Sequence, residues 1–249
     1  MASSSNCEIS VILPTYNEGQ NIIDLIAEIS LYIRNHLGRP FEFIVVDDDS
    51  PDKTWQIAQE HFAADSWVKV IRRTKQKGLA ASIRQGIQEA SGQIVVWLDC
   101  DFSMPTYKVP ELINKVLSGY DVAVGSRFIQ GGKDVRGPTD SWLPVILSQA
   151  MNSFISFSLG SSFKDYTSGF VAARKDIFEK IKIRGDYGEY FIEFIYQVRK
   201  QGFKLLEIPY YCLPRRAGSS KTGANLADWI KKGWKYIILT LDLKLGGKG

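Results

Sequence analysis

Short apolar runs alternate with amphipathic stretches along most of the chain. Runs rich in Ile, Val and Phe predict strands at Glu8–Leu13, Phe41–Val46, Trp67–Ile71, Ile94–Leu98 and Tyr120–Gly125. Apolar residues at helical spacing, or a proline preceded by acids, predict helices at Ile22–Ile33, Pro51–Phe62, Leu79–Ala90 and Lys108–Leu117. Strands that alternate with helices are joined by right-handed crossovers. The pattern therefore predicts an α/β fold, a mostly parallel sheet with helices on both faces.

The second half of the chain adds longer helices and two polar loops. Its predicted elements are helices at about Pro144–Leu159, Tyr190–Lys200 and Leu226–Leu245, and a strand at Lys204–Ile208. Gln130–Thr139 is rich in glycine and charge and predicts a mobile loop, and Pro214–Gly223 predicts a basic one. We see no internal repeat and no long linker. We therefore expect a single domain plus a C-terminal amphipathic helix.

Two acids follow the apolar strand Ile94–Leu98 at the point where it ends. Residues i and i+2 of an extended chain point the same way, so Asp99 and Asp101 are expected to share a side. Open α/β sheets bind their ligands beyond the carboxyl ends of their strands. Two carboxylates there can hold Mg²⁺ or Mn²⁺, with a ligand diphosphate completing the coordination shell. The same residues are compatible with a turn that caps a helix near Met104.

Composition and charge exclude several classes of protein. The 249 residues are 45% hydrophobic and carry a formal net charge of +4, with acids dispersed among Lys and Arg, so no nucleic-acid partner is expected. Cys7, Cys100 and Cys212 lack metal-ligand spacing and indicate a reducing compartment. The two histidines, His36 and His61, lie in predicted helices, which argues against a histidine triad or histidine metal site.

Targeting segments and the common nucleotide fingerprints are also not expected. No apolar run approaches the roughly 18 residues of a transmembrane helix, and residues 1–6 predict a flexible tail rather than a signal peptide. The first strand leads into Pro14-Thr-Tyr-Asn-Glu18 instead of a glycine-rich turn, and a Gly-Lys-Ser/Thr loop is missing. A dinucleotide dehydrogenase or a P-loop kinase is therefore not predicted.

Seven short motifs stand in a fixed order between Ile9 and about Gly223. They are Pro14-Thr-Tyr-Asn-Glu18, Val46-Asp-Asp-Asp-Ser-Pro-Asp52, Gly78-Leu-Ala, Asp99-Cys-Asp-Phe-Ser103, Gly125-Ser-Arg127, Asp165-Tyr-Thr-Ser-Gly-Phe170 and Arg215-Arg-Ala-Gly-Ser-Ser-Lys221. In this order they resemble family 2 glycosyltransferases of the GT-A fold, most closely the polyprenyl-phosphate (dolichol-phosphate) mannosyltransferases. The resemblance implies a catalytic domain over residues 7–223 and a C-terminal helix over 224–249.

The resemblance implies a nucleoside pocket at the ends of the first two strands. Pro14, Tyr16 and Glu18 would line it, with Val46 and Asp48 touching base and ribose. An acid at a strand end is a good acceptor for ribose hydroxyls. At least one of the acids at 47–49 is expected to cap a helix instead.

The resemblance also assigns the metal and the leaving group. Asp99 and Asp101 would bind the metal on the donor diphosphate, with Ser103 as a third contact and Cys100 beside the donor. The basic residues expected to meet the charge on the leaving nucleoside diphosphate are Arg127, Arg215 and Lys221. The loop that holds the last two is a candidate lid.

The implied reaction is inverting transfer of a hexose, most closely mannose from GDP-mannose, to a polyprenyl (dolichyl) phosphate. A phosphate monoester with a second pKa of about 6 is largely dianionic near pH 7 and attacks without a general base. One departure concerns the acceptor: Pro144 stands where the family usually has a basic residue. Lys133 and Arg136, with Arg127, are therefore expected to hold the acceptor phosphate, and Arg136 is favoured for its bidentate fork.

Two other functions stay open at the level of sequence. A family 2 transferase could use another nucleotide-sugar or a saccharide acceptor, for which a carboxylate base among Glu189, Glu193 and Asp165 would be required. A non-catalytic nucleotide-sugar-binding protein would leave the metal acids and the basic loop without a purpose.

The C-terminal helix predicts contact with a membrane. An apolar stripe at helical spacing comprises Leu226, Trp229, Ile230, Trp234, Ile237, Ile238, Leu241 and Leu245. Lysines at 231, 232, 235 and 244 suit anionic headgroups. A helix packed on the core is the competing interpretation. The expected location is peripheral, at the cytoplasmic face of a membrane, with a membrane-protein partner as one option.

Overall fold

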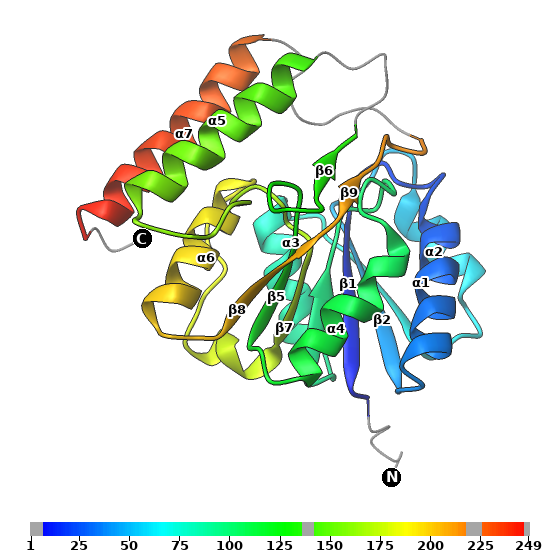
Figure 1. Cartoon of the computed structure of the whole chain (residues 1–249). Coiled ribbons are helices and arrows are strands. Elements are labelled where there is room, and N and C mark those ends of the chain that lie inside the picture. Colours follow the sequence, from blue (N-terminus) through cyan, green and yellow to red (C-terminus); the bar gives the residue numbers. More distant parts are fainter. Residues whose placement is uncertain (1–6, 136–141, 218–225, 247–249) are drawn as a thin grey trace.

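A seven-stranded sheet runs through the computed structural model, which describes residues 7–135, 142–217 and 226–246 (Figure 1). Its strands are β1 (Ile9–Thr15), β2 (Phe41–Asp47), β3 (Val68–Arg72), β4 (Ile94–Trp97), β5 (Val122–Ser126), β7 (Val171–Arg174) and β8 (Leu205–Pro209). They lie in the order β3-β2-β1-β4-β7-β5-β8. Every pair is parallel except the two that β7 makes, with β4 and β5. The mostly parallel sheet of one domain is confirmed.

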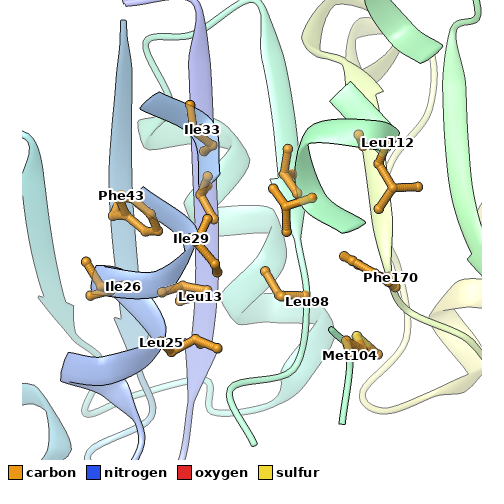
Figure 2. Close-up of a cluster of buried hydrophobic side chains, with 14 of the residues drawn as sticks. Leu13, Leu25, Ile26, Ile29, Ile33, Phe43, Leu98, Met104, Leu112 and Phe170 are labelled. Atoms are coloured by element: carbon orange, nitrogen blue, oxygen red, sulfur yellow. The ribbon is translucent and has the colours of Figure 1, made fainter. Parts of the chain in front are cut away.

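Helices cover both faces of this sheet. They are α1 (Ile22–His36), α2 (Thr54–His61), α3 (Leu79–Glu89), α4 (Val109–Leu117), α5 (Trp142–Ser158), α6 (Glu189–Lys200) and α7 (Leu226–Lys244), with short 3₁₀ turns at Thr106–Lys108 and Lys175–Glu179. Successive residues of a strand point to opposite faces. Leu13 of β1 accordingly belongs to a cluster that includes side chains of α1 and α4 (Figure 2), and Ile12 belongs to a cluster with side chains of α3 and α6 on the other face. Both layers share the sheet, so the two clusters belong to one domain.

The carboxyl ends of β1, β2, β4 and β5 meet at one edge of the sheet. Strand β7 runs the other way, so its first residue, Val171, lies at this same edge. The segment 165–170 that precedes β7 is therefore brought beside the segments that follow the parallel strands. More than half of the predicted site residues come from these connections.

A second, two-stranded sheet sits above this edge (Figure 1). Strand β6 (Lys133–Asp134) pairs in parallel with β9 (Tyr211–Cys212). The prediction of a loop over all of Gln130–Thr139 is therefore wrong for its middle, and residues 136–139 lie outside the described residues. Two-residue strands have no periodicity that a sequence pattern could reveal.

Helices α5 and α7 lie side by side as an outer layer, and α7 also contacts α6 (Figure 1). The packed face of α7 is not the predicted apolar stripe: Thr240 and Leu243 are buried, whereas Trp234 is 61% and Leu245 is 84% exposed. Across the described residues, no helix has the length and apolar character needed to cross a membrane.

Candidate active site

Asp99 and Asp101 follow the end of β4, and they differ in burial. Asp101 is buried and Asp99 is exposed. The chain turns at residues 100–101, so the expectation that an extended backbone aligns the two side chains is wrong. Phe102 takes a left-handed φ of 64°, and the backbone N–H of Ser103 donates to Oδ1 of Asp101 at 2.9 Å. The turn thereby fixes the Asp101 carboxylate.

The second carboxylate oxygen of Asp101 faces a cation. Nε of Arg215 lies 3.2 Å from Oδ2, and the arginine side chain is 35% exposed. One carboxylate oxygen of Asp101 is thus hydrogen-bonded within its own turn, and the other faces the positive charge of Arg215. In the part of the chain that the structure describes, no three His, Cys, Asp or Glu side chains cluster. The carboxylates of Asp99 and Asp101 are ligands of the kind that a hard cation takes, with substrate oxygens and water as its other ligands.

Asp47 ties the end of β1 to the end of β2. Its buried carboxylate accepts from the hydroxyl of Thr15 at 2.8 Å and from the N–H and hydroxyl of Ser50 at 2.8 and 2.6 Å. The N-cap residue of α2 is Lys53, which makes no capping bond through its side chain, and Oδ1 of Asp52 accepts from the first helical N–H, that of Thr54, at 3.0 Å. Helix α2 consequently begins at Thr54 and not at Pro51.

The carboxylate of Asp48, at the same strand end, accepts hydrogen bonds from three groups of the protein. It accepts from Nη1 of Arg73 at 2.6 Å, from the hydroxyl of Ser82 at 3.0 Å and from the N–H of Gly78 at 2.6 Å. A ribose hydroxyl would therefore meet a carboxylate that is already oriented. The sequence analysis missed Arg73, although the last residue of β3, Arg72, lies beside the acidic end of β2 and Arg73 follows it directly.

The other predicted nucleoside contacts lie at different depths. Tyr16 is 42% exposed, whereas Glu18 is buried and accepts from Nδ2 of Asn21 at 2.9 Å. Pro14 is partly buried, and its carbonyl accepts a weak hydrogen bond from the Cys100 thiol at 3.6 Å. Val46 is completely buried in the core, behind the edge rather than on its surface.

Arg127 is buried among carboxylates. Its Nε and Nη2 donate to Asp165 at 2.9 and 2.8 Å, Nη2 also donates to Thr167 at 2.8 Å, and Nη1 lies 3.6 Å from Asp134. Burial is the largest single influence and would lower the pKa of Arg127, but the charge and hydrogen bonds of Asp165, together with Tyr210 and Cys212, raise the pKa overall. The guanidinium predicted to meet a diphosphate is thus already paired, with its side chain 8% exposed.

The remaining candidates are divided between described and undescribed segments. Lys133 is exposed in β6, and Arg136 and Lys221 lie outside the described residues. Among the candidate bases, Asp165 is fully buried in the pair with Arg127. Glu193 in α6 is also buried, which raises its pKa despite Arg184 at 3.7 Å.

Comparison with known proteins assigns this arrangement to a family. The model of glycosyl transferase family 2 matches residues 10–182. A dolichol-phosphate mannosyltransferase from Pyrococcus furiosus is 37% identical over 225 residues, which are 90% of this chain and 62% of that one. A polyprenol monophosphomannose synthase from Mycolicibacterium smegmatis is 32% identical over 230 residues, 89% of this chain and 84% of that one. The chain thus spans less than two thirds of the length of the archaeal relative.

Solved structures show the same fold. A glucosyl-3-phosphoglycerate synthase from Mycobacterium tuberculosis, in complex with Mn²⁺, UDP and its product, superposes with a TM-score of 0.68 at 19% identity. The match covers 98% of this chain and 81% of that one. The predicted GT-A fold is confirmed.

Proposed function

This chain belongs to glycosyl transferase family 2, and on that premise we propose that it transfers mannose from GDP-mannose to a polyprenyl phosphate. The proposal is supported by the names of its relatives and by one feature of the site. Asp101 and Arg215 meet at the carboxyl edge of the sheet, where a carboxylate for a metal and a cation for a leaving diphosphate are both needed.

In this proposal the donor spans the ends of β1, β2 and β4. Tyr16 and Glu18 face the nucleoside, and Asp48 is oriented for the ribose by the donors around it. The diphosphate lies toward Asp99 and Asp101. Mg²⁺ or Mn²⁺ bound there would neutralise diphosphate charge. Ser103 is the proposed third contact of the metal, and Cys100 and Lys221 complete the proposed donor contacts.

The acceptor needs alignment rather than a base. A polyprenyl phosphate is largely dianionic near pH 7 and supplies its own nucleophile. Asp165 is buried against Arg127, as expected if no carboxylate in that segment must remove a proton. The chain's task is to hold the two substrates in line and to stabilise the departing nucleoside diphosphate, with inversion at the sugar carbon.

Basic residues near β6 are proposed to hold the acceptor phosphate. Lys133 is exposed on this strand, which pairs with β9 just before the basic loop. Arg136 follows in the same segment. Arg127 stabilises this region through its contact with Asp134. Its guanidinium is also proposed to interact with the acceptor phosphate. A point charge about 4 Å from the dianion would supply roughly 4 kcal/mol at an effective dielectric of about 20.

The acceptor also implies a lipid surface. We place the outer layer of α5 and α7 against the headgroups at the cytoplasmic face, because both helices leave large apolar side chains exposed. These are Ile146, Leu147 and Phe157 of α5, and Trp234, Ile238 and Leu241 of α7 with Leu245 just beyond it. Residues 7–223 would then form the catalytic part and residues 224–249 a surface helix, alone or with a membrane-protein partner. Cys7, Cys100 and Cys212 are thiols that form no disulfide with one another, which accords with a reducing compartment.

A panel of labelled nucleotide-sugars tests the function. Each is incubated with the chain and a polyprenyl phosphate, with and without Mn²⁺, and the label is counted in the organic and aqueous phases. Organic-extractable label from GDP-mannose that requires the metal is the expected result. Label transferred only to saccharides would replace the lipid acceptor, and no transfer from any donor would contradict the enzymatic function.

A further inference from the structure

Two consecutive arginines at the start of the basic loop have different partners. Arg215 pairs with Asp101. Arg216 pairs with helix α1, where its Nη2 donates to Oε1 of Glu28 at 2.8 Å and its Nη1 lies 3.7 Å from Asp24. The two neighbouring arginines therefore point to different partners, Arg215 to the site and Arg216 to a helix.

Arg216 is also stacked on the turn that carries the metal acid. Its guanidinium carbon lies 3.6 Å from the centroid of the Phe102 ring, and its backbone N–H donates to the carbonyl of Asp101 at 3.0 Å. Phe102 is buried and has a left-handed backbone, so the position of its ring is fixed by the turn. The planar guanidinium of an arginine can stack on an aromatic ring and bind carboxylates at the same time, which the ammonium group of a lysine cannot do in the same way.

The same segment is held at two further points. The N–H of Leu213 donates to the carbonyl of Ser103 at 2.9 Å, and Nδ2 of Asn21 donates to the carbonyl of Ala217 at 3.4 Å. Residues 213–217 are therefore laid along the turn at 101–103. These bonds fix the backbone of Arg215. Only its side chain would have to move for the guanidinium to turn from Asp101 toward a diphosphate.

We propose that Arg216 is a positioning residue, which anchors the start of the basic loop on α1 and Phe102 so that Arg215 faces the donor diphosphate. Arg216 itself makes no contact with substrate in this assignment. An isolated half-exposed ion pair contributes little, but here two acids and one ring converge on one side chain. The inference rests on the proposed function for its kinetic test, and its structural test is independent of it.

The matched control is Arg174. Its side chain is 50% exposed, against 49% for Arg216, and it also pairs with two acids, Asp121 and Asp176. It lies at the far end of β7, at the opposite edge of the sheet. Arg174→Ala therefore removes the same charge and a similar surface network away from the site.

The kinetic test is a cycle of Arg215→Ala, Arg216→Ala and the double variant, assayed with GDP-mannose and a short polyprenyl phosphate in detergent. Because small displacements of positioned groups cost up to about 100-fold, we expect Arg216→Ala to lower kcat roughly 10-fold or more, with a smaller change in the donor KM. It should have almost no effect when Arg215 is already Ala. Arg216→Lys should recover only part of the loss, and Arg174→Ala should match the wild type.

The structural test is hydrogen exchange of segments 99–104 and 212–217, with no substrate present. Arg216→Ala should speed exchange in both, Glu28→Gln should do so more weakly, and Arg174→Ala should not. Unchanged exchange would overturn the anchor, and so would kcat losses that multiply in the double variant, because these would mean that Arg216 acts independently of Arg215. If the wild type transfers no mannose, the proposed function fails, and hydrogen exchange alone decides the inference.

Discussion

The indole N–H of Trp97 donates a hydrogen bond to the hydroxyl oxygen of Tyr190, 3.0 Å away in the interior of the protein. The bond joins the last residue of β4 to the first turn of α6, below the carboxyl edge of the sheet. Burial raises the pKa of Tyr190, and the charge of the nearby Asp99 raises it further. Tyr190 is therefore a neutral, fixed support under the candidate metal site.

Tyr190→Phe should destabilise the fold by about 1–3 kcal/mol, because it leaves the buried indole N–H without an acceptor. Urea unfolding followed by Trp fluorescence measures the loss. Tyr107→Phe serves as the control, since Tyr107 is 51% exposed and a surface change is worth within about 0.5 kcal/mol. Equal losses in the two variants would mean that the bond contributes nothing measurable.

Asp101→Asn should abolish metal-dependent donor binding while leaving the fold intact. The amide oxygen can still accept from the N–H of Ser103, so the turn is retained. Titration calorimetry with GDP and Mn²⁺ measures the binding. The rate of mannose transfer should fall by at least about 100-fold, as when an enzyme loses a group that stabilises charge in the transition state. Asp176→Asn, far from the site, is the control. Normal turnover in Asp101→Asn would remove the metal from this position.

Arg127→Ala should cost about 3–5 kcal/mol of unfolding free energy, because it leaves the buried carboxylates of Asp165 and Asp134 without the guanidinium that offsets their charge. Arg174→Ala removes an exposed arginine with two acidic partners and should cost about 1 kcal/mol or less. Denaturant unfolding of both variants provides the comparison. A loss no larger than that of the control would show that Arg127 is not a structural charge.

Glu193 should make the fold less stable as the pH rises. Its folded pKa is raised above 4.5 by burial, so the folded state holds the proton more tightly than the unfolded chain. Its contribution is therefore fully present below about pH 4.5 and is lost as the pH rises through the folded pKa. Unfolding free energies from pH 4 to 7 should fall more steeply in the wild type than in Glu193→Gln. Parallel curves would contradict a raised pKa.

The exposed face of α5 and α7 should hold the protein on anionic vesicles. Trp234→Ser with Leu245→Ser removes two of its most exposed apolar side chains and should reduce flotation severalfold, since membrane binding scales with buried apolar area. Leu31→Ser on α1, where the leucine is 56% exposed, is the matched control. Cutting the chain after Gly223 extends the test to the whole helix. Flotation that is equal in all variants would exclude this face as the lipid contact.

The strands and helices could be predicted because each buries a periodic set of side chains. The direction of β7 could not, since a buried apolar strand has the same pattern in either direction. The two-residue strands β6 and β9 are formed by contacts between segments far apart in the sequence. The buried face of α7 was also missed, because the helix has apolar residues on more than one side and only its neighbours decide which side packs.

At the site, the positions of the acids could be predicted and their partners could not. Asp48 and Asp101 stand at strand ends, which the pattern locates. Their cations, Arg73 and Arg215, come from other segments, and a single sequence does not say which basic side chain folds back onto which acid. The pairing of Arg127 with Asp165, 38 residues away, is the same kind of contact. Local periodicity in the sequence predicts the helices and strands, whereas the site depends on ion pairs between residues far apart in the sequence.

The small sheet of β6 and β9 has a thermodynamic consequence for the two substrates. The segment proposed to hold the acceptor leaves from β6, and the segment that carries Arg215 leaves from β9. A ligand that shifts one strand must shift the other, because the two share their backbone hydrogen bonds. Linkage then requires that nucleotide and lipid phosphate change each other's affinity by one and the same factor. We expect the two substrates to bind cooperatively, with the ladder between β6 and β9 as the mechanical link.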